Sequence, residues 1–170
     1  MARPEGASML ISVDPGIKGA LAFFGPGESV SVHDMPTRAK PGNTKIRNEI
    51  DPKALQVLLR LRVPADEKGL VVMENLNTFA GGSVQTMGSL EATKAVICTV
   101  CELSGFDMAF VSPREWQRFF GIKATPSETT KQQSLRLARQ LFGNDYCPLQ
   151  KHDGRADSLL IGRYAQRNFL

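Results

Sequence analysis

Four acidic residues stand at three distant points of this sequence, in positions where a side chain can do chemistry. Asp14 and Glu74 each end a short apolar run, of the kind that forms a buried strand. Asp153 and Asp157 lie four positions apart in the segment KHDGRADSLLI near the C-terminus. Residues four apart share one face of a helix, so these two carboxylates are expected to point together.

Clustered carboxylates repel one another and are costly to bury, and a divalent cation offsets that repulsion. Oxygen ligands in a chain with only two histidines favour Mg²⁺ or Mn²⁺ over zinc. Such a group can hold two ions about 4 Å apart, which is the arrangement used in two-metal phosphodiester hydrolysis. Each acid also has a structural explanation: Asp14 as a turn cap, Glu74 as the start of a loop and Asp153 as a helix N-cap. The coincidence of all four favours a metal site.

The segments that must position these acids alternate between strand and helix patterns. Strands are expected at 9–13, 20–24, 29–33, 69–74 and 106–111. Helices are expected from 52 to 63, from 83 to 103, in a short stretch after 112, from 127 to 142, and from about 152 to the C-terminus. This order predicts an α/β fold in which a mixed sheet is flanked by helices. If the first and fourth strands are neighbours, Asp14 and Glu74 lie at one edge of the sheet, where ligands collect in such folds.

The composition fits one globular domain that spans residues 1–170, with 42% hydrophobic and 22% charged residues. No apolar run approaches the roughly 18 residues of a membrane span, and the N-terminal MARPEGAS has no apolar signal-peptide core. An unexported protein of the cytoplasm or an organelle interior is therefore expected. Cys98, Cys101 and Cys147 do not pair evenly, which indicates buried thiols in a reducing compartment.

The net charge of +4 is a mild bias, but its distribution is informative. The segment 37–47 contains proline and glycine, has no acid and carries the four cations Arg38, Lys40, Lys45 and Arg47. Its composition indicates a mobile loop, which either binds phosphates or is simply solvated.

Three of these motifs together resemble the RuvC-type Holliday junction resolvases, in particular their short phage, bacterial and chloroplast-type relatives. The motifs are Asp-Pro-Gly at the first strand end, Val-Met-Glu-Asn at the fourth, and His-Asp-Gly-Arg-Ala-Asp-Ser-Leu-Leu near the C-terminus. The resemblance implies a ribonuclease H-like fold with a five-stranded sheet. It also implies a homodimer that cuts four-way DNA junctions by symmetric nicks with Mg²⁺ or Mn²⁺. The implied ligands of two ions are Asp14, Glu74, Asp153 and Asp157.

One departure from the family pattern concerns the last pair of acids. The housekeeping enzymes space these positions three apart, and the residue three before Asp157 is Gly154. Asp153 must then supply the ligand from one residue earlier. The adjacent His152 remains an alternative fourth ligand, or a surface or capping histidine.

The resemblance also gives meaning to residues outside the acidic group. The helix 83–103 is expected to pack two subunits together. Lys131 resembles a family lysine near the scissile phosphate, where it would be catalytic, although it also fits a solvated helix lysine. Phe79 is either a wedge against an unstacked base pair or an ordinary packed aromatic. The remaining candidates for DNA contact are the phosphate-binding residues Arg114, Arg118 and Lys123, which would extend the basic segment. Trp116, Phe119 and Phe120 are expected in the core.

Three other functions compete with junction resolution. A different ribonuclease H-like nuclease would act on an RNA–DNA hybrid or on other branched DNA. A non-catalytic junction-binding protein would be expected to lose at least one of the acids. An actin-like ATPase also opens with an acid-glycine hairpin, but 170 residues leave no room for its two duplicated domains.

Overall fold

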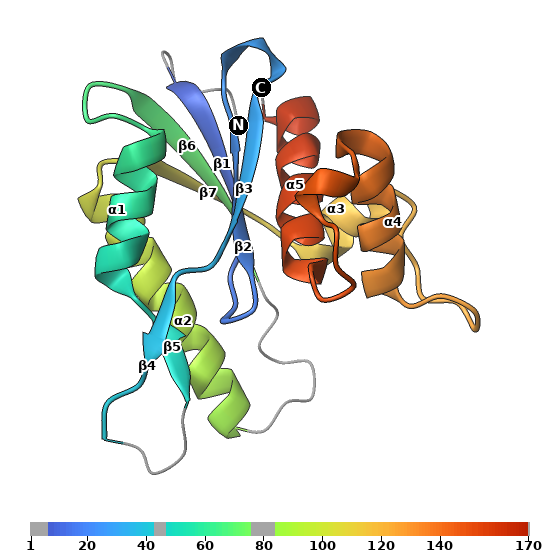
Figure 1. Cartoon of the computed structure of the whole chain (residues 1–170), viewed down its shortest axis with the longest axis horizontal. Coiled ribbons are helices and arrows are strands. Elements are labelled where there is room, and N and C mark those ends of the chain that lie inside the picture. Colours follow the sequence, from blue (N-terminus) through green and yellow to red (C-terminus); the bar gives the residue numbers. More distant parts are fainter. Residues whose placement is uncertain (1–6, 43–46, 76–83, 170) are drawn as a thin grey trace.

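The computed structural model of this chain describes residues 7–42, 47–75 and 84–169. Within these ranges the main sheet has five strands, in the spatial order β3-β2-β1-β6-β7 (Figure 1). Their bounds are Ala7–Asp14 for β1, Ala20–Phe24 for β2, Val30–Asp34 for β3, Lys68–Glu74 for β6 and Asp107–Val111 for β7. The first three form an antiparallel meander, and β6 and β7 continue the sheet parallel to β1. The predicted mixed sheet is confirmed.

Helices cover both faces of this sheet, with α1 and α2 on one face and α3, α4 and α5 on the other (Figure 1). Their bounds are Pro52–Arg62 for α1, Val84–Leu103 for α2, Pro113–Phe119 for α3, Thr130–Phe142 for α4 and Asp153–Asn168 for α5. Side chains alternate along β1, so Ile11 and Val13 join one core while Leu10 joins the other. The sheet is therefore held between two apolar layers, which makes its strand ends a rigid support.

The helix starts follow from capping residues that are recognisable in the sequence. Asp51 caps α1 by accepting from the backbone N–H groups of Lys53 and Ala54, at 3.1 and 3.0 Å. A capping box of Ser112 and Glu115 opens α3. The prediction for α4 is wrong by three residues, because this helix begins at Thr130 rather than at position 127. Thr129 caps it and forms a second capping box with Gln132, a signal that the sequence prediction overlooks.

The basic segment 37–47 is predicted as a loop, and this prediction is wrong at its N-terminal end, where residues 37–39 form a strand. β4 (Thr37–Ala39) pairs antiparallel with β5 (Asn48–Ile50), with Arg38 opposite Glu49. Arg38 Nε and Glu49 Oε1 are 2.9 Å apart, and such opposite charges stabilise a strand pair. The acid lies just beyond the basic segment, so the composition of that segment alone does not reveal the pairing.

The predicted core is mostly confirmed. Trp116 is fully buried and Phe120 packs partly buried against the core, but Phe119 is 49% exposed, so its prediction as a core residue is wrong. The ring of Phe119 lies edge-on to Phe120 and Tyr164 at the surface of the α3 side. The three cysteines are free thiols, and two of them are buried. Among the described residues, no helix is long and apolar enough to cross a membrane.

Candidate metal centre

The sheet brings Asp14 and Glu74 to the same edge. They are the last residues of β1 and β6, which are adjacent and parallel, with Val13 in register with Met73. A tight turn after Asp14 holds the first of them in place, because the N–H of Gly16 donates to the Asp14 carbonyl at 3.1 Å. A Cβ at Gly19 would clash with that same carbonyl, so the turn needs glycine there. The two carboxylates therefore stand side by side where both strands end.

Helix α5 brings the other two acids to this edge. Asp153 is its first residue and Asp157 lies one turn later on the same face. Close packing fixes the helix against β1: Ser12 Oγ donates to the Ser158 carbonyl at 2.6 Å, in the interior. At Gly154, a Cβ would lie 2.9 Å from Gly19 Cα and would clash with the Lys18 carbonyl.

The contact at Gly154 accounts for the place of the acid at the start of α5. The residue three before Asp157 lies against the turn that follows Asp14, where any side chain would collide with backbone. An acid at that position would force the helix away from β1. A carboxylate at the N-terminal end of α5 is therefore accommodated at Asp153 and not at Gly154.

Burial and mutual repulsion perturb these carboxylates strongly. Burial raises the pKa of Asp14 well above its usual value, and the nearby charges of Asp157, Glu74 and Asp153 raise it further. Burial, together with Glu74 and Asp153, raises the pKa of Asp157 to about 7, although a hydrogen bond with Ser134 opposes the shift. Burial also raises the pKa of Glu74. Proximity of several carboxylates in a poorly solvated place is the condition that a bound cation relieves.

Hydrogen bonds and ion pairs reach several of these acids from the surrounding elements. Trp116 Nε1 donates to Glu74 Oε1 at 2.7 Å, and this bond opposes the rise in the pKa of Glu74. Asp157 Oδ1 is buried and has no hydrogen-bond partner among the described residues. Lys131 Nζ lies 2.7 Å from Asp153 Oδ2, and this contact raises the pKa of Lys131. This unpaired oxygen of Asp157 can therefore serve as a ligand of a cation.

The donor set of the four carboxylates fits Mg²⁺ or Mn²⁺. They supply hard oxygen atoms, of which one is buried and unpaired, as such ions require. No three His, Cys, Asp or Glu side chains in the described ranges converge closely enough to form a ready ligand group. Lys131 holds one oxygen of Asp153 instead. Asp14, Glu74, Asp153 and Asp157 are therefore the residues whose oxygens would hold such an ion.

The contacts of His152 and Asp153 help to decide which of them is the fourth residue of the acidic site. His152 is 8% exposed, and its Nδ1 accepts the backbone N–H of Leu149 at 3.2 Å. It occupies the N-cap position of α5 but makes no side-chain capping bond. The charge of Asp153, by contrast, acts on both Asp14 and Asp157. His152 is thus a buried residue that supports the loop before α5, and not a surface or capping histidine.

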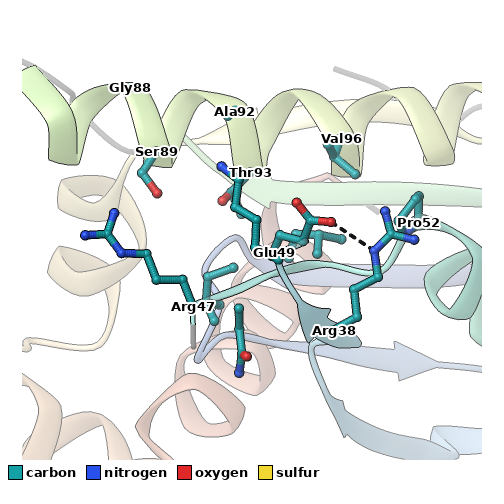
Figure 2. Close-up of a pocket in the computed structure, with 13 residues that line it drawn as sticks. Arg38, Arg47, Glu49, Pro52, Gly88, Ser89, Ala92, Thr93 and Val96 are labelled. Carbon is teal, nitrogen blue, oxygen red and sulfur yellow. Dashed lines mark hydrogen bonds and ion pairs between the residues drawn. The ribbon is translucent and has the colours of Figure 1, made fainter. Parts of the chain in front are cut away.

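The candidate DNA-contact residues fall into separate places. Arg38, Lys40 and Arg47 line a groove of about 420 Å³ between α2 and the β4–β5 pair. Figure 2 shows its other wall, where Ser89 and Thr93 of α2 face the strand pair. Ile17, from the turn after Asp14, also lines this groove, so the groove adjoins the acidic edge.

The other basic candidates lie outside this groove. Arg114 and Arg118 lie on α3, the helix whose Trp116 reaches Glu74. Lys123 is exposed in the loop after α3, and its backbone is tied to the side chain of Gln133. Lys45 and Phe79 lie outside the described residues.

Sequence reasoning missed how three residues shape this site. Trp116 is expected in the core without a further role, and its bond to Glu74 joins residues 42 positions apart. Ser134 is unremarkable in the sequence, and Gly154 is noted there only for the spacing of the acids. The sequence signals nearest to them are the capping box before Trp116 and the displaced acid beside Gly154, but neither reveals a contact partner.

Comparison with solved structures supports the fold, whereas comparison of the sequence with known proteins finds no match. No family model matches the sequence, and neither does any curated protein. The structure of Thermus thermophilus RuvC is similar with a TM-score of 0.52 and 14% identity, over 94% of this chain and 95% of that one. RuvC from the same organism in complex with a Holliday junction substrate gives 0.53 and 12%, with the same coverage. The yeast mitochondrial Holliday junction resolvase Ydc2 gives 0.46 and 14%, over 94% of this chain and 78% of that one. The arrangement of strands and helices in this chain is therefore the ribonuclease H-like fold of RuvC.

Proposed function

We propose that this chain is a metal-dependent endonuclease that resolves four-way DNA junctions by paired, symmetric phosphodiester hydrolysis. The observation that carries the proposal is the gathering of acidic side chains at one sheet edge, where proximity and burial raise the pKa of Asp14 and Asp157. The fold shared with RuvC agrees with it, and a RuvC structure contains a Holliday junction substrate.

In this proposal the acids Asp14, Glu74, Asp153 and Asp157 hold Mg²⁺, or Mn²⁺ in its place, as a pair of ions. When bound, such ions activate a water molecule and stabilise the charge of the leaving oxygen. The chain itself contributes position: β1 and β6 present two acids from a rigid sheet edge, and α5 presents the others. Lys131, which pairs with Asp153 in this structure, would place its charge beside the scissile phosphate and stabilise the transition state.

The substrate backbone lies along the basic groove in this proposal. Arg38 already has an acidic partner in Glu49, whereas Lys40 and Arg47 add positive charge to the same groove. Such contacts would fix the register of the DNA without reading its sequence. Arg114, Arg118 and Lys123 would meet a second stretch of backbone on the α3 side.

A symmetric substrate calls for two active sites, and a homodimer through α2 would supply them. Thr93 and Ile97 turn one side of α2 toward the interior, while Ala95 and Thr99 are exposed. The small side chains at these two positions would let a second copy approach closely, although Glu91 and Glu102 are exposed on the same face of the helix. One domain per subunit would then act on each of two opposed strands.

Strand cleavage of defined substrates tests the proposal. A labelled immobile four-way junction, a linear duplex and an RNA–DNA hybrid are each incubated with the protein and Mg²⁺, with EDTA as the metal-free control. Paired, symmetric nicks confined to the junction are expected. Cleavage of the hybrid alone would assign the site to another ribonuclease H-like activity, and junction binding without any cleavage would indicate a binding protein. Asp14→Asn is expected to bind the junction and not to cut it.

A further inference from the structure

A buried hydrogen bond joins Trp116 of α3 to Glu74 at the end of β6, and it gives Trp116 a role besides packing in the core. Trp116 is 0% exposed and Glu74 is 7% exposed. The indole N–H is a donor with no acceptor function, and it meets Glu74 Oε1 at 2.7 Å. A hydrogen bond from a fixed donor to a carboxylate is among the stronger kinds in proteins.

The fold leaves this indole little freedom. Glu74 is in register with Val111 on β7, and the N–H of Asn75 donates to the Val111 carbonyl at 2.8 Å. Ser112 then opens α3 with its capping box, and Trp116 follows one helical turn later. The ring packs in the core on the α5 side of the sheet, so its N–H is held toward the carboxylate.

We propose that Trp116 is a positioning residue of the metal centre, whose indole N–H holds one oxygen of Glu74 so that the other is presented to the cation. This inference rests on the proposed function, because it requires Glu74 to be a metal ligand. The ligands of metal sites are commonly oriented by such partners, and losing the partner typically lowers metal affinity by about 10–100-fold. Trp116 would therefore set the metal affinity of the site without touching metal or substrate.

The sequence contains one tryptophan, which gives the test an unambiguous signal. In ¹⁵N-labelled full-length protein, Trp116 produces a single indole N–H resonance. Titration with Mg²⁺ is expected to shift this resonance with the same midpoint as the binding measured by calorimetry. In Glu74→Gln, the resonance is expected to stay unmoved by Mg²⁺. An indole resonance that does not respond while calorimetry records binding would overturn the inference.

A variant removes the donor while keeping an aromatic ring. Trp116→Phe is expected to weaken Mg²⁺ binding by about 10–100-fold in calorimetry. Ile122→Val is the matched control, since Ile122 packs in the same core and its apolar side chain has no donor for Glu74. It is expected to bind Mg²⁺ as the wild type does. Equal affinity of Trp116→Phe and the wild type would also overturn the inference.

The design separates this inference from the proposed function. If the wild-type protein binds no Mg²⁺, the metal centre itself is refuted, and the inference with it. If the wild type binds Mg²⁺ and cuts junctions but Trp116→Phe binds equally well, only the inference fails. If Trp116→Phe does not fold, as judged by circular dichroism, the indole titration of the wild type decides alone.

Discussion

Without metal, the charge of Asp157 should lower the free energy of unfolding at neutral pH. Replacing Asp157 by Asn should remove this loss of stability. The pKa of Asp157 is about 7 in the folded chain, against 3.8 for an unperturbed aspartate. The folded state thus holds a proton more tightly than the unfolded state, so stability falls as pH rises from about 4 to about 7 and stays low above that. A difference of this size corresponds to roughly 4 kcal/mol, since one pKa unit is about 1.4 kcal/mol.

Urea unfolding in EDTA at pH 5 and at pH 8 measures this effect. Asp157→Asn is expected to exceed the wild type by up to about 4 kcal/mol at pH 8, with a clearly smaller gain at pH 5. In a domain of this size that gain corresponds to about 8–16 °C in Tm. Glu91→Gln, an exposed change on α2, serves as the control and is expected to stay within about 0.5 kcal/mol of the wild type.

Added Mg²⁺ should narrow the stability difference between the two proteins at pH 8. The cation binds the folded wild type and stabilises it by mass action, whereas the variant lacks the ligand. A stability difference between Asp157→Asn and the wild type that is the same at pH 5 and pH 8 would refute the reasoning. So would a variant that is less stable than the wild type in EDTA at pH 8.

Three further predictions test the other parts of the site. Gly154→Ala is expected to destabilise the fold by about 1–3 kcal/mol in urea, because its Cβ collides with the turn after Asp14; unchanged stability would contradict this account of the displaced acid. Lys131→Gln is expected to lower the junction cleavage rate by at least about 10²-fold while junction binding persists, and equal rates would remove Lys131 from catalysis. Arg47→Gln is expected to reduce the slope of log K against log salt by about one in a junction-binding assay, and an unchanged slope would remove it from the DNA path.

The fold was predictable because its signals are local. Short apolar runs ending in turn residues marked the five main strands, and caps such as Asp51 and Ser112 marked the helix starts. The β4–β5 pair was missed because its strands are only three residues long and the stabilising acid, Glu49, lies outside the basic segment. Phe119 was misassigned because helical spacing does not say which side of a short helix faces solvent.

The acidic group was predictable for a different reason. Asp14 and Glu74 end buried strands, so they lie at one edge if β1 and β6 are neighbours, as the structure shows, and Asp153 and Asp157 share a helix face by spacing. Their roles as metal ligands stay predictions, as do those of Lys131 and the basic residues. Lys45 and Phe79 lie outside the described residues, so they stay predictions as well.

The sequence by itself determined which segments form the five main strands and the helices, because hydrophobic period and capping act within a few residues. The sheet edge at which the acids gather follows from the strand order of the structure, in which β1 and β6 are neighbours. Only the tertiary structure decided which atoms meet there. The bond from Trp116 to Glu74, the ion pair of Lys131 with Asp153 and the close approach of Gly154 to the first turn each join separate elements. Such contacts depend on how the helices pack against the sheet. Many side chains together determine that packing, so no single sequence motif predicts it.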